Sequence, residues 1–206
     1  MYRSVIWDFD GTLFDTYPSI ISVYMEELEK KGIKEDRDHV EFLFRTSFGH
    51  IWGYLTDTYG LTKEYYDSIE PIWRKKEIEM SYPFPGIREL LTDIVNNGGK
   101  NYIYTHRNNT TLLFLEKEEM THLFSDMVLS EEGFPAKPAP DALNALMKRN
   151  SINPKEAIMI GDREIDVRSG FNANIASCLF LAMDYSNTCA SFIAKNADEL
   201  RKIIMQ

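Results

Sequence analysis

Two aspartates, Asp8 and Asp10, stand one residue apart directly after the apolar residues 5–7, and Gly11 and Thr12 follow them. If the apolar run is a buried strand, the chain bends at its end and both carboxylates can point at one place. Burying two carboxylates together is costly unless they share a cation or a proton. The pair therefore suggests a divalent metal and phosphate chemistry, although an Asp-Gly pair after a strand is also typical of a simple turn.

Further polar residues follow later apolar runs in the same way. Thr105 comes after the predicted strand 102–104, and Asp162 and its neighbour Gly161 come after the predicted strand 158–160. In open parallel sheets, ligands bind at the edge formed by the carboxyl ends of the strands. We therefore expect the side chains of Thr105 and Asp162 to lie at the same edge as Asp8.

Two more charged residues complete a candidate site. Lys137 lies in a segment with Pro138 and Pro140, and prolines restrict the backbone around them. A lone lysine at such a place is most often a solvated side chain. Asp166 follows four residues after Asp162, so the two share a face if a helix begins there. Acidic residues in a first helical turn are also common as helix caps.

The composition indicates a globular protein and excludes some partners. The 206 residues are 44% hydrophobic and 27% charged, and the formal net charge is -9 without a cluster of lysine or arginine. This argues against nucleic acid and anionic membranes as partners. We see no signal-peptide pattern and no apolar run long enough to span a membrane. Cys178 and Cys189 lack metal-ligand spacing, so we expect reduced thiols and a cytoplasmic location. The oligomeric state stays open, and a monomer is compatible with the sequence.

The apolar periodicity predicts an α/β protein with a helical insert. After a first strand at 3–8, the pattern is only helical to about residue 81; from residue 87 onwards, helices alternate with strands and no hairpin turn occurs. This order indicates a doubly wound parallel sheet, a Rossmann-like core covered on both faces. The expected strands are 3–8, 102–104, 127–129, 158–160 and 175–181; the expected core is 1–15 with 83–206, and the expected insert is 16–82.

Taken together, these motifs resemble those of the haloacid dehalogenase superfamily, and specifically its phosphatase branch. Residues 8–12 look like its first motif, Thr105 like its second, Lys137 like its third, and residues 161–166 like its fourth. The resemblance covers nearly the whole chain. The helical insert, residues 16–82, is similar to the cap domain of the phosphoglycolate phosphatase and β-phosphoglucomutase group.

The resemblance implies a role for each aspartate of the first motif. Asp8 would be the nucleophile that forms an aspartyl-phosphate. Asp10 would donate a proton to the leaving oxygen and then accept one from the hydrolytic water. The dehalogenase branch typically lacks this second aspartate, so its presence favours phosphoryl transfer. Asp8, Asp162 and the backbone carbonyl of Asp10 would be the protein ligands of Mg²⁺.

The resemblance also assigns the remaining motif residues. Thr105 and Lys137 would hold the phosphoryl oxygens and neutralise developing charge. Asp166 would orient the metal shell or Lys137 rather than bind the metal directly.

Several other residues are candidates for substrate contact. Thr12 belongs to the first motif. His106 stands where many relatives have asparagine, and Arg107 follows it; both could contact substrate or phosphate, or simply cap the next helix. Arg45 and His50 lie near the region where similar caps carry a specificity loop, although exposed charges on a helix are usually only solvated.

The sequence therefore predicts a Mg²⁺-dependent phosphatase for a small phosphorylated metabolite, phosphoglycolate or a sugar phosphate. A phosphomutase uses the same core residues and is the alternative. A binding protein without catalytic activity on the same fold is a third hypothesis, which the intact motif residues count against.

Overall fold

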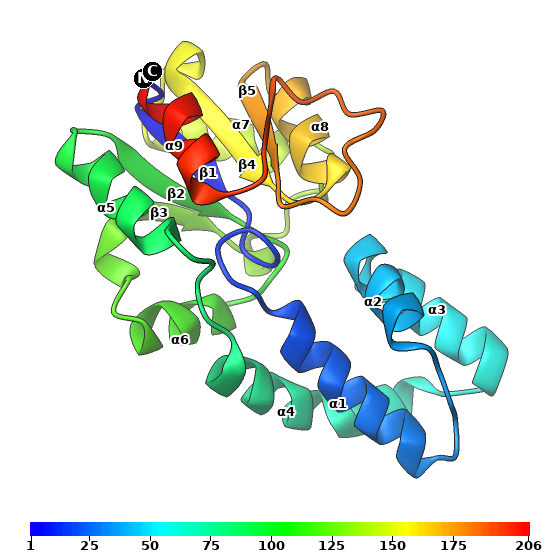
Figure 1. The fold of residues 1–206 in the computed structure, drawn as a ribbon. Helices are drawn as coiled ribbons and strands as arrows, with labels where there is room; N and C mark the ends of the chain where they lie inside the picture. Colours follow the sequence, from blue (N-terminus) through cyan, green and yellow to red (C-terminus); the bar gives the residue numbers. More distant parts are fainter. The chain divides into compact units, whose positions relative to one another are not determined.

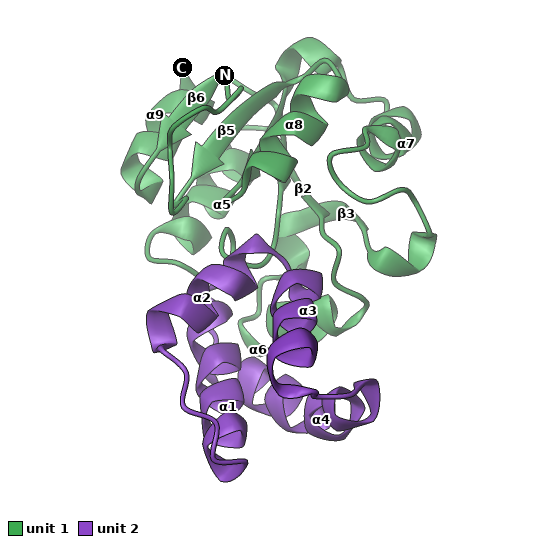
Figure 2. Ribbon diagram, turned by 90° about the vertical axis from the view of Figure 1, so that its right-hand side faces the viewer, with its two compact units in different colours: residues 1–14, 83–206 green, residues 15–82 purple.

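The computed structural model describes residues 1–206, which form two compact units (Figure 2). The first unit comprises Met1–Phe14 and Pro83–Gln206, and the second comprises Asp15–Tyr82. The second unit is thus inserted into the first after its first strand and the loop 8–14 that follows it.

The first unit is built on one sheet of six parallel strands in the order β3-β2-β1-β4-β5-β6 (Figure 1). The strands are β1 (Ser4–Trp7), β2 (Lys100–Tyr104), β3 (Phe124–Val128), β4 (Ala157–Gly161), β5 (Ala176–Phe180) and β6 (Phe192–Ala194). The sequence predicted the first five. It missed β6, which has only three residues, one of them the 42% exposed Ile193, and so gives no buried apolar run.

Helices cover both faces of this sheet, so the predicted doubly wound α/β fold is confirmed. On one face, Leu143 and Leu146 of α7 (Asp141–Arg149) pack in one cluster with Ile6, Tyr102 and Met159 of three neighbouring strands. On the other face, α5 (Ile87–Asn96) and α9 (Ala197–Met205) contact each other, α5 contacts β2 and α9 contacts β6. The helices are α5 (Ile87–Asn96), α6 (Thr110–Lys117), α7 (Asp141–Arg149), α8 (Glu164–Asn172) and α9 (Ala197–Met205), with short 3-10 helices at Thr121–Leu123, Ser130–Glu132 and Pro154–Glu156.

The second unit contains helices alone, as the sequence predicted. They are α1 (Tyr17–Lys30), α2 (Arg37–Thr46), α3 (Phe48–Tyr59) and α4 (Lys63–Met80). Helix α3 ends at Gly60, whose φ of 65° is a left-handed conformation that glycine adopts without strain. The four helices enclose a core of their own, which includes Tyr24, Phe44, Leu55 and Trp73.

A buried asparagine ties the two strands that carry the first and second motifs. The Trp7 indole donates to Asn101 Oδ1 at 3.1 Å, and Asn101 Nδ2 donates to the carbonyls of Leu91 at 3.0 Å and Leu123 at 3.2 Å. An Asn101→Leu variant would leave the buried Trp7 N–H without its acceptor and remove both amide contacts, so we expect it to lower the free energy of unfolding by about 3 kcal/mol in urea denaturation. The same change at the exposed Asn144 should alter stability by less than about 0.5 kcal/mol. Equal effects at both sites would contradict the assigned role of Asn101.

Candidate active site

Three adjacent strands deliver polar residues to one edge of the sheet. Asp8 directly follows β1, Thr105 follows β2 and Asp162 follows β4, and the order β2-β1-β4 makes these strand ends neighbours. All three residues are buried. The backbone N–H of Asp8 still donates to the carbonyl of Ile160 at 2.8 Å, so the first aspartate is placed by the sheet itself rather than by a loose loop.

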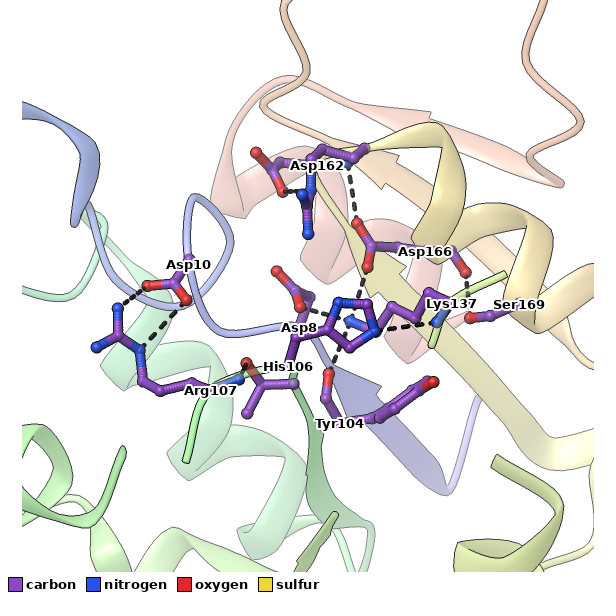
Figure 3. A network of polar contacts seen from close by, with 11 residues as sticks. Asp8, Asp10, Tyr104, His106, Arg107, Lys137, Asp162, Asp166 and Ser169 are labelled. Atoms are coloured by element: carbon purple, nitrogen blue, oxygen red, sulfur yellow. Dashed lines mark hydrogen bonds and ion pairs between the residues drawn. The ribbon is translucent and has the colours of Figure 1, made fainter. Parts of the chain in front are cut away.

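Lys137 lies at the centre of this edge (Figure 3). Its Nζ donates to Asp8 Oδ1 at 2.5 Å, to Asp166 Oδ1 at 2.7 Å and to the carbonyl of Tyr104 at 2.8 Å. These three bonds use all three ammonium hydrogens. The lysine is therefore a buried member of the site and not a solvated side chain. A hydrogen bond from Lys137 to a phosphoryl oxygen would have to replace one of the three.

The two carboxylates that share Lys137 differ in their protonation equilibria. Burial raises the pKa of Asp8 to about 6, and the neighbouring Asp166 adds to the rise, while Lys137 opposes it. Burial also acts to raise the pKa of Asp166, but Lys137 and Arg163 outweigh it and the net shift is downward. For Lys137, burial acts to lower the pKa, but attraction to Asp166 and Asp8 prevails and raises it. Of the two carboxylates, Asp166 thus keeps its negative charge to lower pH than Asp8.

A group of three carboxylates at this edge could hold a divalent cation. One oxygen from each of Asp8, Asp162 and Asp166 lies within 4.8 Å of the others. Asp8 Oδ2 is buried and accepts no hydrogen bond, which is costly unless a cation compensates. Both oxygens of Asp166 already accept hydrogen bonds, from Lys137 Nζ and from the backbone N–H of Arg163 at 3.1 Å. Asp166 is therefore less available to a cation than Asp8, and the roles of Asp8 and Asp162 as metal ligands stay a prediction.

Gly161 makes room for the Asp166 side chain. A Cβ at position 161 would lie 2.2 Å from the Cβ of Asp166 and 2.4 Å from its carboxyl carbon, distances that no real contact reaches. A Gly161→Ala variant must push Asp166 away from Lys137, and we expect it to lower stability by about 2–3 kcal/mol in urea denaturation. The same change at Gly53 in α3, where no heavy atom lies within 4 Å, should be neutral or stabilising. A Gly161→Ala protein as stable as the wild type would show that Asp166 is not held as described.

Asp10 turns away from Lys137 and towards Arg107 (Figure 3). Arg107 Nη2 donates to Asp10 Oδ1 at 2.5 Å, and its Nε donates to Asp10 Oδ2 at 3.2 Å. The guanidinium carbon also lies 4.9 Å from the ring centroid of Phe114 and 5.5 Å from that of Phe9. Arg107 thus binds the Asp10 carboxylate through two hydrogen bonds, which fix the orientation of the carboxylate.

Neither His106 nor Arg107 caps the following helix. The Oδ1 of Asn108 instead accepts from the backbone N–H of Thr110 at 3.1 Å, in the first turn of α6. His106 Nε2 accepts from the backbone N–H of Lys137 at 3.0 Å. Helix capping, one of the two alternatives that the sequence left open, is therefore wrong for this pair.

The hydroxyls of the predicted site are both buried. Thr105 Oγ1 accepts from the backbone N–H of Arg107 at 3.1 Å, which leaves its own hydrogen available for donation. Thr12 Oγ1 has no hydrogen-bond partner in the protein. A direct contact of Thr12 with substrate stays a prediction.

The two candidates in the helical unit have partners within that unit. Arg45 Nε donates to Glu41 Oε1 at 2.8 Å, and its guanidinium carbon lies 4.3 Å from the ring centroid of Tyr17. The backbone N–H of His50 donates to Ser47 Oγ at 3.0 Å at the start of α3, and His50 is exposed. A substrate role for Arg45 and His50 stays a prediction.

A doubly wound sheet that gathers aspartates, a threonine and a lysine at its carboxyl edge defines a class of hydrolase, and comparison with known proteins identifies it. The model of the haloacid dehalogenase-like hydrolase family matches residues 5–180. The chain therefore belongs to this family, as its motifs predicted, and the predicted hydrolase class is confirmed. No helix is both long enough and apolar enough to cross a membrane.

Individual relatives agree with this assignment. A phosphoglycolate phosphatase of Vibrio parahaemolyticus is 24% identical over 98% of this chain and 96% of its own length. The pyrophosphatase PpaX of Bacillus velezensis is 27% identical over 82% of this chain and 79% of its own length. Among solved structures, a hydrolase from Streptococcus pneumoniae is 30% identical with a TM-score of 0.69, over 88% of this chain and 94% of that one.

Proposed function

We propose that this chain is a Mg²⁺-dependent phosphatase that hydrolyses a small phosphorylated metabolite through an aspartyl-phosphate on Asp8. One observation carries the proposal. Lys137 holds one oxygen of the buried Asp8 carboxylate at 2.5 Å, while the other oxygen accepts no hydrogen bond. A carboxylate that is fixed in orientation and has one oxygen without a hydrogen bond is suited to attack phosphorus.

The surrounding residues supply the other parts of such a reaction. An Asp8 oxygen bonds to phosphorus while the bond from phosphorus to the leaving oxygen breaks. Asp10 would give the leaving oxygen a proton and later take one from the water that cleaves the aspartyl-phosphate. To carry that proton, Asp10 must give up one of its two hydrogen bonds with Arg107. The Thr105 hydroxyl donates to a phosphoryl oxygen, and the charge of Lys137 offsets the negative charge that gathers around Asp8.

Asp8 and Asp162 would hold Mg²⁺, with Asp166 supporting the site and the carbonyl of Asp10 as a further ligand. Carboxylate and carbonyl oxygens are the donors that this ion prefers. When bound, the cation supplies positive charge between the phosphate and the attacking carboxylate.

Phosphoglycolate and sugar phosphates are the proposed substrates. The names of the phosphoglycolate phosphatase and pyrophosphatase relatives support a small phosphorylated compound. Residues 16–82 would act as a cap that controls access to the site. Both cysteines are free thiols, which fits a cytoplasmic enzyme.

The deciding experiment measures phosphate release from phosphoglycolate, several sugar phosphates and pyrophosphate, with Mg²⁺ and with excess chelator. We expect release that requires Mg²⁺ and is lost in an Asp8→Asn protein. Isomerisation of a sugar phosphate without release would instead establish the phosphomutase. Mg²⁺ binding without turnover of any compound would favour the binding protein.

A further inference from the structure

The main chain that carries Lys137 is held by a histidine from a distant part of the sequence. The backbone N–H of Lys137 donates to Nε2 of His106 at 3.0 Å, across 31 residues. Lys137 is buried and lies outside any helix or strand, so no regular backbone partner is available to this N–H. A buried N–H needs an acceptor, and here a side chain provides it.

The position of this main chain decides where the ammonium group of Lys137 lies. A lysine side chain is flexible, so three simultaneous contacts with Asp8, Asp166 and the Tyr104 carbonyl require a fixed starting point. A second anchor lies on the following residue, because Asn172 Nδ2 of α8 donates to the carbonyl of Pro138 at 2.9 Å. Side chains from two different elements thus hold the backbone at Lys137 and just after it.

His106 is suited to accept a hydrogen bond at neutral pH. Burial, together with the nearby cations Lys137 and Arg163, lowers its pKa to about 4, although the carboxylates of Asp166 and Asp10 oppose the shift. The ring lies edge-on to Tyr104, with centroids 6.2 Å apart and planes at 81°. A neutral imidazole whose Nε2 accepts must carry its single proton on Nδ1.

We propose that His106 is a positioning residue that acts through Lys137: its Nε2 fixes the backbone from which the lysine reaches Asp8. The catalytic part of this inference rests on the proposed phosphatase function, but the contact itself does not. His106 would thus stand where the family resemblance leads us to expect asparagine, but it would hold the Lys137 backbone and not contact substrate.

The contact can be tested without any activity measurement. In ¹⁵N-histidine-labelled protein, four histidines give ring signals, and the His106→Gln variant identifies those of His106. We expect the neutral tautomer protonated on Nδ1 at pH 7. A signal for the tautomer protonated on Nε2, or for an imidazolium, would overturn the proposal. Hydrogen exchange of the Lys137 amide should be about tenfold faster in His106→Leu; unchanged exchange would also overturn it.

The positioning role is tested with two variants at His106. The side-chain carbonyl of His106→Gln can accept the same N–H, whereas His106→Leu cannot. We expect kcat to fall about 10-fold or more in His106→Leu with little change in KM, and about 3-fold or less in His106→Gln. His122→Leu, at an exposed position, is the matched control and should leave kcat unchanged.

The outcomes separate this inference from the proposed function. Equal losses in the Gln and Leu variants, or none in either, would overturn the positioning role while leaving the phosphatase intact. A wild-type protein that releases no phosphate would overturn the proposed function, and the tautomer and the exchange rate would still decide whether His106 holds Lys137.

Discussion

Replacing Asp8 with asparagine is expected to reduce phosphate release more than about 1000-fold and, in the absence of metal, to stabilise the protein. An amide of the same shape keeps an oxygen for Lys137 but cannot form the aspartyl-phosphate, so the loss should appear in kcat. Residual release is measured with Mg²⁺ and phosphoglycolate or the best substrate found. Asp57→Asn, at an exposed position in α3, is the matched control and should leave both activity and stability unchanged.

The stability gain follows from the raised pKa of Asp8, which burial moves to about 6. Below about pH 4 the Asp8 carboxyl is protonated in both the folded and the unfolded chain, so it does not lower the free energy of unfolding. As the pH rises from about 4 to about 6, the Asp8 carboxyl ionises only in the unfolded chain, so the free energy of unfolding falls. Above about pH 6 the carboxyl is ionised in both states, and the loss of stability stays constant. Asp8→Asn removes it, so we expect a gain of the order of 2–3 kcal/mol at pH 7.5, since each pKa unit corresponds to about 1.4 kcal/mol.

The pH dependence makes this prediction specific. In chelator-treated protein, the difference in unfolding free energy between Asp8→Asn and the wild type should shrink towards zero as the pH falls from 6 to 4. A difference that is constant with pH would mean that the variant acts through packing rather than through charge. An active Asp8→Asn protein would refute the nucleophile assignment altogether.

The sequence predicted the part of the site that follows from topology. Strands that run parallel end at one edge, so Asp8, Thr105 and Asp162 had to meet there once the alternation of strands and helices was recognised. The sequence missed strand β6 because only one of its three residues is fully buried and Ile193 is exposed, so no buried apolar run marks it. Its place at the end of the sheet is decided by pairing with β5, which no local pattern records.

What the sequence could not predict are contacts between loops. Arg107 donates hydrogen bonds to Asp10, which lies 97 residues away in the sequence. His106 accepts a hydrogen bond from the backbone N–H of Lys137, which lies 31 residues away. Both residues are polar and follow a strand, so their types alone allowed either substrate contact or helix capping. The one available signal was that His106 stands where the family resemblance leads us to expect asparagine. It indicated that this region differs from relatives without saying how.

Replacing Lys137 with methionine is expected to destabilise the metal-free protein by about 3–5 kcal/mol and to abolish phosphate release. Methionine fills much of the same volume but leaves Asp8 and Asp166 buried without their shared cation, and removing one partner of a buried ion pair is strongly unfavourable. Urea denaturation at pH 7.5 in chelator measures the loss. Lys148→Met, at an exposed position of α7, is the matched control and should change stability by less than about 0.5 kcal/mol.

Two further measurements show whether uncompensated charge is the cause. Combining Lys137→Met with Asp8→Asn should recover part of the lost stability, because only one buried carboxylate then lacks a partner. Saturating Mg²⁺ should stabilise Lys137→Met more than it stabilises the wild type, since the ion supplies the missing positive charge next to the same carboxylates. If neither change restores stability, Lys137 matters mainly through packing. In that case Asp8 and Asp166 must avoid charge repulsion by sharing a proton instead of a cation.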